Sequence, residues 1–142
     1  MSKRQTVRDV MTPDPIVLDL TATVRDAARA MRARDIGDVL VANEGRFWGI
    51  LTDRDIVVRA VAEHAEAPGL CKLADVCTTD VECLGPDEDV MAAIRVMERS
   101  AVRRIPVVEE GRAIGVVTLG DLAVARDRES VLGKISAAPP LR

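Results

Sequence analysis

The chain has 142 residues, 48% of them hydrophobic, and a formal net charge of −3 at pH 7. This acidic balance argues against bulk nucleic-acid binding, which needs many cationic side chains to neutralise phosphates. The N-terminus has no apolar secretory core, and no apolar run approaches the length of a membrane span. We therefore expect a cytoplasmic protein that binds neither membranes nor nucleic acid.

The sequence contains one unit written twice, with an offset of 66 residues. GILTDRDI at 49–56 recurs as GVVTLGDL at 115–122, and the alignment needs no gap between residues 7 and 60. Self-similarity at a fixed offset indicates a repeat architecture. The predicted domains are a first unit at 1–66, a second unit at 67–135 and a flexible tail at 136–142.

Each unit begins with a short extended segment, PIVLD in the first copy and VECLG in the second. A helix is predicted next, because apolar residues recur at intervals of three and four positions. These residues are Val24, Ala27, Ala28 and Met31 in the first copy, and Val90, Ala93, Ile94 and Met97 in the second. Thr or Asp residues precede both helices, as N-cap positions prefer.

Two apolar strands follow the helix in each unit, DVLVA and FWGIL in the first copy, IPVV and AIGVV in the second. A turn that contains Gly lies between the strands, which predicts a hairpin. A second helix is expected to begin at the Thr-x-x-Asp phrase. In the first copy we expect this helix to bury Ile56 and Val57 and to leave Val58, Val61 and Ala65 for a partner.

The predicted order in each unit is β-α-β-β-α, which gives an α+β fold. A unit of about 60 residues buries too little surface to be stable alone. We therefore expect the two units to pack against each other, sheet against sheet, with pseudo-twofold symmetry.

The repeated phrase and its flanking strands resemble a known family. Two tandem β-α-β-β-α units that each close with Gly, two apolar residues, Thr, two variable residues and Asp are similar to a CBS-domain pair, also called a Bateman module. The likeness covers nearly the whole chain and rests on the runs VRDVMT, IGDVLV, GILTDRDIV, VRRIPVV and GVVTLGDL. LTDRDIV together with VRRIPVV most resembles the small stand-alone CBS-pair proteins of bacteria.

The Thr-x-x-Asp phrase allows two interpretations. It fits a capping box, in which Thr is the N-cap and the Asp side chain returns to its backbone N–H. The resemblance adds a second role, because in ligand-binding members the Asp holds the ribose of an adenosine nucleotide and the Thr supports the ribose or phosphate. Capping alone and capping with ligand binding both remain open.

The resemblance implies a ligand cleft between the units, closed by Thr118 and Asp121. Its other residues would be Thr12, Ile16, Ile36 and Gly37, with Arg103 and Arg104 near the phosphate. Arginine binds phosphate through charge-assisted hydrogen bonds of about 1.5–3 kcal/mol. The alternative for the two arginines is a solvated pair, or ion pairs with Glu98 or Glu109.

A second, weaker cleft would be closed by Thr52 and Asp55, with Thr78, Glu82 and Val102. At the positions that match Arg103 and Arg104, the first copy has Gly37 and Asp38. Because an aspartate repels phosphate, we expect the two clefts to differ in affinity.

Residues for catalysis are scarce, since the chain has one His and no nucleophile–base pair or Walker or Rossmann glycine pattern. No catalytic residue and no cofactor are predicted. Cys71, Cys77 and Cys83 lie six residues apart, which is not a zinc spacing, so no metal is predicted either. We predict a regulatory or sensor module that binds AMP, ADP, ATP or S-adenosylmethionine and acts as a homodimer. The alternative is a ligand-free structural or protein-interaction dimer, induced by stress.

Overall fold

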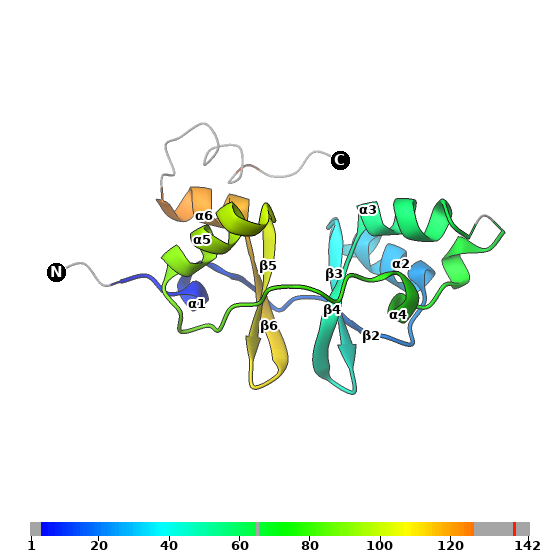
Figure 1. Cartoon of the computed structure of the whole chain (residues 1–142), viewed down its shortest axis with the longest axis horizontal. Helices are drawn as coiled ribbons and strands as arrows, with labels where there is room; N and C mark the ends of the chain where they lie inside the picture. Colours follow the sequence, from blue (N-terminus) through cyan, green and yellow to red (C-terminus); the bar gives the residue numbers. More distant parts are fainter. Residues whose placement is uncertain (1–3, 65, 127–137, 139–142) are drawn as a thin grey trace. The chain divides into compact units, whose positions relative to one another are not determined.

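The computed structural model describes residues 4–64 and 66–126, and Ala138. Most of its helices and strands are labelled in Figure 1. The first repeat holds α1 (Val7–Val10), β1 (Thr12–Pro13), β2 (Val17–Asp19), α2 (Val24–Arg34), β3 (Asp38–Asn43), β4 (Arg46–Thr52), α3 (Asp53–Asp55) and the π-helix η1 (Ile56–Val61). The second repeat holds the 3-10 helix η2 (Pro68–Leu70), α4 (Leu73–Val76), α5 (Val90–Ser100), β5 (Arg104–Glu109), β6 (Arg112–Thr118) and α6 (Leu119–Arg126). The predicted α+β class is confirmed.

The sequence offset reappears in the positions of the elements, since α5, β5 and β6 lie 66 residues after α2, β3 and β4. The predicted helix starts are confirmed at Val24 and Val90. Both helices are capped as expected. The Asp26 N–H donates to the Thr23 hydroxyl at 3.2 Å, and the Met91 N–H donates to the Asp89 carboxylate at 2.8 Å.

Tight turns close the two predicted hairpins. Glu44 and Gly45 have φ values of 51° and 82°, and Glu110 and Gly111 have φ values of 52° and 79°. Two consecutive residues with positive φ are typical of a type I′ turn, whose twist matches that of antiparallel strands. Gly is favoured at the second position because it has no Cβ to clash in this region.

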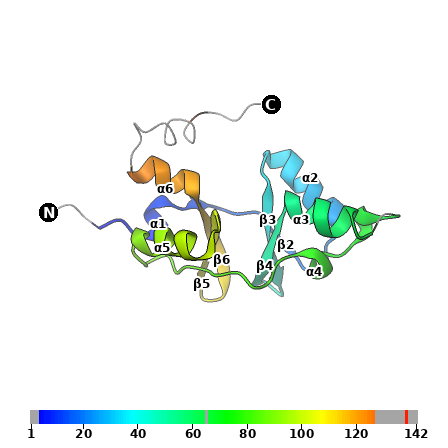
Figure 2. The ribbon, with the colours of Figure 1, turned by 45° about the horizontal axis from the view of Figure 1, so that its top comes forward.

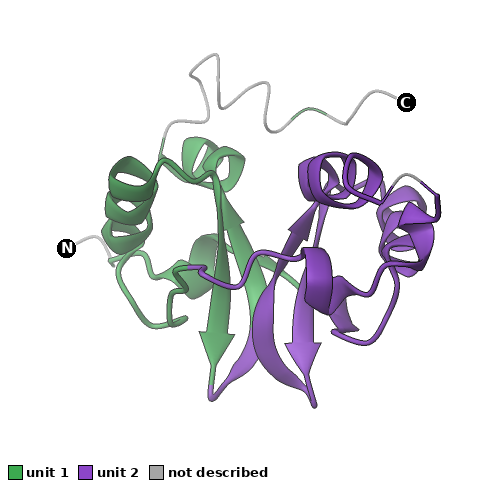
Figure 3. Ribbon diagram, turned by 45° about the vertical axis from the view of Figure 1, so that its right-hand side comes forward, with its two compact units in different colours: residues 1–14, 82–109, 114–142 green, residues 15–81, 110–113 purple. Residues whose placement is uncertain are grey.

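The chain forms two compact units, and neither is a continuous stretch (Figure 3). The described residues of unit 1 fall within 1–14, 82–109 and 114–142, and those of unit 2 within 15–81 and 110–113. The units therefore differ from the predicted 1–66 and 67–135. Each repeat gives its N-terminal segment to the unit built mainly from the other repeat. The predicted tail at 136–142 lies outside the described residues, apart from Ala138.

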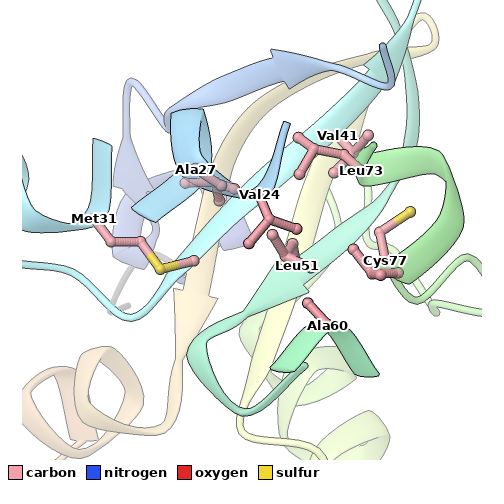
Figure 4. Close-up of a cluster of buried hydrophobic side chains, with 10 residues drawn as sticks. Val24, Ala27, Met31, Val41, Leu51, Ala60, Leu73 and Cys77 are labelled. Carbon is pink, nitrogen blue, oxygen red and sulfur yellow. The ribbon is translucent and has the colours of Figure 1, made fainter. Parts of the chain in front are cut away.

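Unit 2 contains a sheet of order β2-β3-β4, in which β2 is parallel to β3 and β3 is antiparallel to β4. Its aliphatic core joins α2, the sheet and η1 to α4, which comes from the second repeat (Figure 4). Leu73 and Val76 of α4 are 0% and 1% exposed, so they complete this core. The core residues are Val24, Ala27, Met31, Val39, Val41, Leu51, Ala60, Leu73, Val76 and Cys77.

Unit 1 contains a sheet of order β1-β6-β5, in which β1 comes from the first repeat. Figures 1 and 2 show α5 and α6 beside this sheet. Val7 of α1 is fully buried among residues of α5, α6 and the sheet, although it belongs to the first repeat. Backbone hydrogen bonds hold the segment in place, since the N–H groups of Val7 and Arg8 donate to the carbonyls of Glu88 and Pro86.

Two details of the predicted helix faces are wrong. Ala28 is exposed, because α2 turns Val24, Ala27 and Met31 inward instead. Val57 is also exposed, at 59%. The reason is that η1 is a π-helix, with the Ala62 N–H donating to the Val57 carbonyl, so its residues per turn exceed those of the expected α-helix. Val58 and Val61 are exposed as predicted, and Ala65 lies outside the described residues.

Among the described residues the helices are short, and the longest, α2 and α5, have 11 residues each. A bilayer span takes about 20 apolar residues. In the part of the chain that the structure describes, no helix has the length and apolarity needed to cross a membrane.

Candidate functional site

Both copies of the Thr-x-x-Asp phrase form a capping box. The Thr52 N–H donates to the Asp55 carboxylate at 3.0 Å, and the Asp55 N–H donates to the Thr52 hydroxyl at 3.1 Å. Thr118 and Asp121 make the same pair of bonds, both at 3.0 Å. The capping interpretation is therefore confirmed, and the ligand interpretation stays a prediction.

Asp121 has a further partner from the first repeat. The Thr12 hydroxyl donates to its carboxylate, 3.2 Å from each oxygen. This contact depends on β1, which pairs antiparallel with β6 and places Thr12 opposite Val116. Gly115 permits the close pairing, because a Cβ there would lie 2.9 Å from the Thr12 carbonyl oxygen. The structure thus brings Thr12, Thr118 and Asp121 together, and their role in ligand binding stays a prediction.

Arg103 lies immediately before β5, beside the start of α6. The Leu119 N–H donates to the Arg103 carbonyl at 2.9 Å, so this backbone is fixed next to the Thr118 cap. The exposed Arg103 side chain lines a hollow of about 540 Å³ between the end of α5 and α6. Glu98 lines the same hollow, whereas Glu109 forms an ion pair with Arg8 at 2.9 Å.

The predicted site residues are divided between the two units. Unit 1 holds Thr12, Arg103, Arg104, Thr118 and Asp121 of the first cleft, and Glu82 and Val102 of the second. Unit 2 holds Ile16, Ile36 and Gly37 of the first cleft, and Thr52, Asp55 and Thr78 of the second. The Glu82 carboxylate forms an ion pair with Arg99, and the Ser100 hydroxyl donates to it at 3.3 Å.

Asp55 differs from Asp121 in its neighbours. The Nε atom of Arg59 lies 3.8 Å from the Asp55 carboxylate. The Nη1 atom of Arg59 also donates to the carbonyls of Val76 and Cys77, at 3.3 and 3.2 Å. Arg59 thereby ties η1 to the end of α4 and places a positive charge beside Asp55.

Asp121 instead lines a hollow of about 450 Å³ between α1 and α6. This α1/α6 hollow is lined by Gln5, Asp9, Val10, Asp121, Val124 and Ala125. Ala125 stands 66 residues after Arg59, so the second repeat has a methyl group where the first has a guanidinium. Reasoning from the sequence missed this difference, although the aligned repeats display it.

A model of the CBS domain matches residues 7–61 and 73–128. The chain belongs to the CBS domain family. Its relatives with CBS domains include the CBS domain-containing protein YhcV of Bacillus subtilis, 32% identical over 118 residues, which are 83% of each chain. Hypoxic response protein 1 of Mycobacterium tuberculosis is 32% identical over 119 residues, or 83% of this chain and 82% of that protein.

Solved structures of CBS-domain proteins share the fold. A crystal structure of Hypoxic Response Protein I with two coordinated zinc ions has a TM-score of 0.74 and 32% identity, and the match covers 84% of this chain and 97% of that one. The CBS domain pair of MJ0100, in complex with 5′-methylthioadenosine and S-adenosyl-L-methionine, has a TM-score of 0.77 at 22% identity, over 90% and 100%. CBSX2 in complex with AMP has a TM-score of 0.71 at 23% identity, over 84% and 94%. The last two matches show the fold alone.

Cys77 and Cys83 of this CBS-domain pair are poor candidates for metal binding, because the thiolate is the form that binds metal. Burial raises the pKa of the Cys77 thiol. Burial, together with the charge of Glu82, raises the pKa of Cys83 to about 11. Among the residues that the structure describes, no group of three or more His, Cys, Asp or Glu side chains could hold a metal ion.

Proposed function

We propose that this CBS-domain pair is a regulatory module, not an enzyme, and that it binds an adenosine nucleotide of the AMP, ADP, ATP or S-adenosylmethionine class. The observation that carries the proposal is the Asp121 carboxylate in the first turn of α6, beside the hydroxyls of Thr12 and Thr118. A ribose presents two adjacent hydroxyls, and one carboxylate can accept hydrogen bonds from both.

Two further arguments support an adenosine ligand at Asp121. The start of a helix carries a positive potential that favours anionic groups nearby. Proteins of the same fold, MJ0100 and CBSX2, form complexes with adenosine compounds. We extend the proposed site to the remaining residues of the first cleft, Ile16, Ile36, Gly37, Arg103 and Arg104.

We propose that the second set of residues binds more weakly. Arg59 already lies beside the Asp55 carboxylate and offsets its charge, whereas the matching position of the second repeat, Ala125, carries no charge. The weaker set is Thr52, Asp55, Thr78, Glu82 and Val102.

Arg103→Ala tests the phosphate role of Arg103. We expect the wild type to bind AMP more tightly than adenosine by about 1–3 kcal/mol, because an arginine forms charge-assisted bonds with phosphate. The variant should lose this preference and bind adenosine almost unchanged, as measured by calorimetry at low salt. Arg126→Ala is the matched control, since Arg126 lines the same hollow from α6.

Equal affinity of the wild type for AMP and adenosine would contradict the role of Arg103. Absence of binding of either compound at millimolar concentration would contradict the nucleotide proposal itself. The ligand-free interaction module, induced by stress, would then take its place.

We further propose that the protein acts as a homodimer. Val57, Val58 and Val61 of η1 are 59%, 44% and 49% exposed, which leaves an apolar strip on this helix. A second copy would remove the strip from water, and twofold dimers are the commonest closed assembly. Light scattering should give twice the mass of one chain at micromolar concentration. The mass of a single chain would contradict the proposal.

A further inference from the structure

The contacts of Arg59 show how the first repeat holds a guanidinium group that is partly exposed to water. Its Nη1 atom donates to two backbone carbonyls at the end of α4, those of Val76 and Cys77. Its Nε atom faces the Asp55 carboxylate at 3.8 Å. Two carbonyl oxygens and one carboxylate thus lie beside the cation, which suits a planar group with several N–H donors.

The second repeat has a counterpart for each of these three acceptors, and the counterparts Val10 and Asp121 line the α1/α6 hollow. By the 66-residue offset, Val10, Met11 and Asp121 correspond to Val76, Cys77 and Asp55. The backbone agrees, because α1 and α4 both have four residues and both end in an extended residue. The cap N–H at Met11 donates to the Val7 carbonyl at 2.9 Å, and the one at Cys77 donates to the Leu73 carbonyl at 2.9 Å.

The second repeat differs at the position that would carry the guanidinium. Ala125 replaces Arg59 and lines the hollow of about 450 Å³ together with Asp9 and Asp121. The Asp9 carboxylate accepts a hydrogen bond from the Thr6 N–H at 2.9 Å and adds negative charge to the same hollow. The hollow therefore combines two acidic side chains with α1, the counterpart of the helix whose C-terminal carbonyls hold an arginine in the other repeat.

We propose that the α1/α6 hollow binds a guanidinium group supplied from outside this chain. The acceptor set favours an organic cation over a metal ion, since no group of three or more metal-binding side chains gathers among the described residues. The proposal goes beyond nucleotide binding and does not depend on it. Asp121 belongs to both proposed sites, whereas Ala125 belongs to the guanidinium site alone, so a change at Ala125 tests guanidinium binding separately.

Titration of the isotope-labelled protein with ethylguanidinium chloride, followed by NMR, tests the proposal. We expect saturable shifts of the Asp121 and Ala125 amides at millimolar concentration. Ethylurea, which has a similar shape and no charge, should not shift the resonances of these two amides. Equal responses to the two compounds, or no response to either, would overturn the proposal.

Ala125→Arg is the decisive variant, because it supplies the guanidinium from the chain itself. We expect it to weaken ethylguanidinium binding at least tenfold and to raise the melting temperature. Unchanged binding in this variant would overturn the proposal. Ala123→Arg is a control of the same charge, since Ala123 lines the α5/α6 hollow rather than this one, and it should leave ethylguanidinium binding intact.

Arg59→Ala provides a positive control, because it removes the guanidinium from a place known to hold one. Ethylguanidinium should then shift the amides of Asp55 and Ala60. A response there, with none at Asp121 and Ala125, would overturn the proposal for unit 1.

Arginine with both its termini blocked shows whether the guanidinium group comes from a protein side chain or from a small molecule. Binding as tight as that of ethylguanidinium supports an arginine side chain of a protein partner, whereas binding of free arginine alone supports a small molecule.

Discussion

Asp121→Ala should weaken the binding of AMP by about 2–4 kcal/mol, because the ribose hydroxyls lose two charge-assisted hydrogen bonds. Asp55→Ala should matter much less, since Arg59 already lies 3.8 Å from the carboxylate of Asp55. Calorimetry on the wild type and both variants measures the difference. Each variant also removes a capping box, so the matched pair controls for the loss of the cap itself.

Asp121→Asn separates ligand binding from capping. An Asn side chain keeps an oxygen that can accept from the Thr118 N–H, and so it retains most of the cap. We expect its melting temperature to stay close to that of the wild type, while its affinity for AMP falls. Unchanged affinity in both Asp121 variants would mean that the Thr-x-x-Asp phrase only caps the helix.

Leu73→Ala should lower the free energy of unfolding by about 2–5 kcal/mol, the usual cost of removing a fully buried leucine side chain. Leu73 is 0% exposed and packs in the core of unit 2. Leu70→Ala is the control, because Leu70 lies only three residues earlier and is 70% exposed. That change should stay within about 0.5 kcal/mol. Urea unfolding measures both.

Hydrogen exchange shows which unit Leu73 supports. The Leu73→Ala variant should lose protection first in β3 and β4, which share its core, although Leu73 belongs to the second repeat. Loss of protection confined to β5 and β6 would contradict the exchange of segments between the repeats.

The helices, hairpins and caps followed from the sequence because their causes act over a few residues. The apolar spacing that begins at Val24 and Val90 predicts α2 and α5, and Gly45 and Gly111 mark the turns. The capping boxes needed only the Thr and Asp of each phrase. The buried face of η1 could not be predicted from the sequence, since nothing in its apolar pattern indicates a π-helix.

The candidate site was predicted in part. The repeat and the family resemblance indicated Thr118, Asp121 and Thr12, and the structure brings these three together. The contacts of Arg59 with Val76 and Cys77 could not be predicted, because a backbone carbonyl leaves no mark in a sequence. The role of Ala125 follows only once those contacts are known.

The sequence by itself determined that the chain is two copies of one α+β unit, because a fixed offset and a local apolar pattern are properties of the chain alone. The tertiary structure decided which segment completes which unit. Val7 and Leu73 are both apolar and occupy equivalent positions, so either could fill either core. Only packing and backbone hydrogen bonds place Val7 with the second repeat and Leu73 with the first. That exchange brings Thr12 to Asp121, because the strand that carries Thr12 pairs with β6.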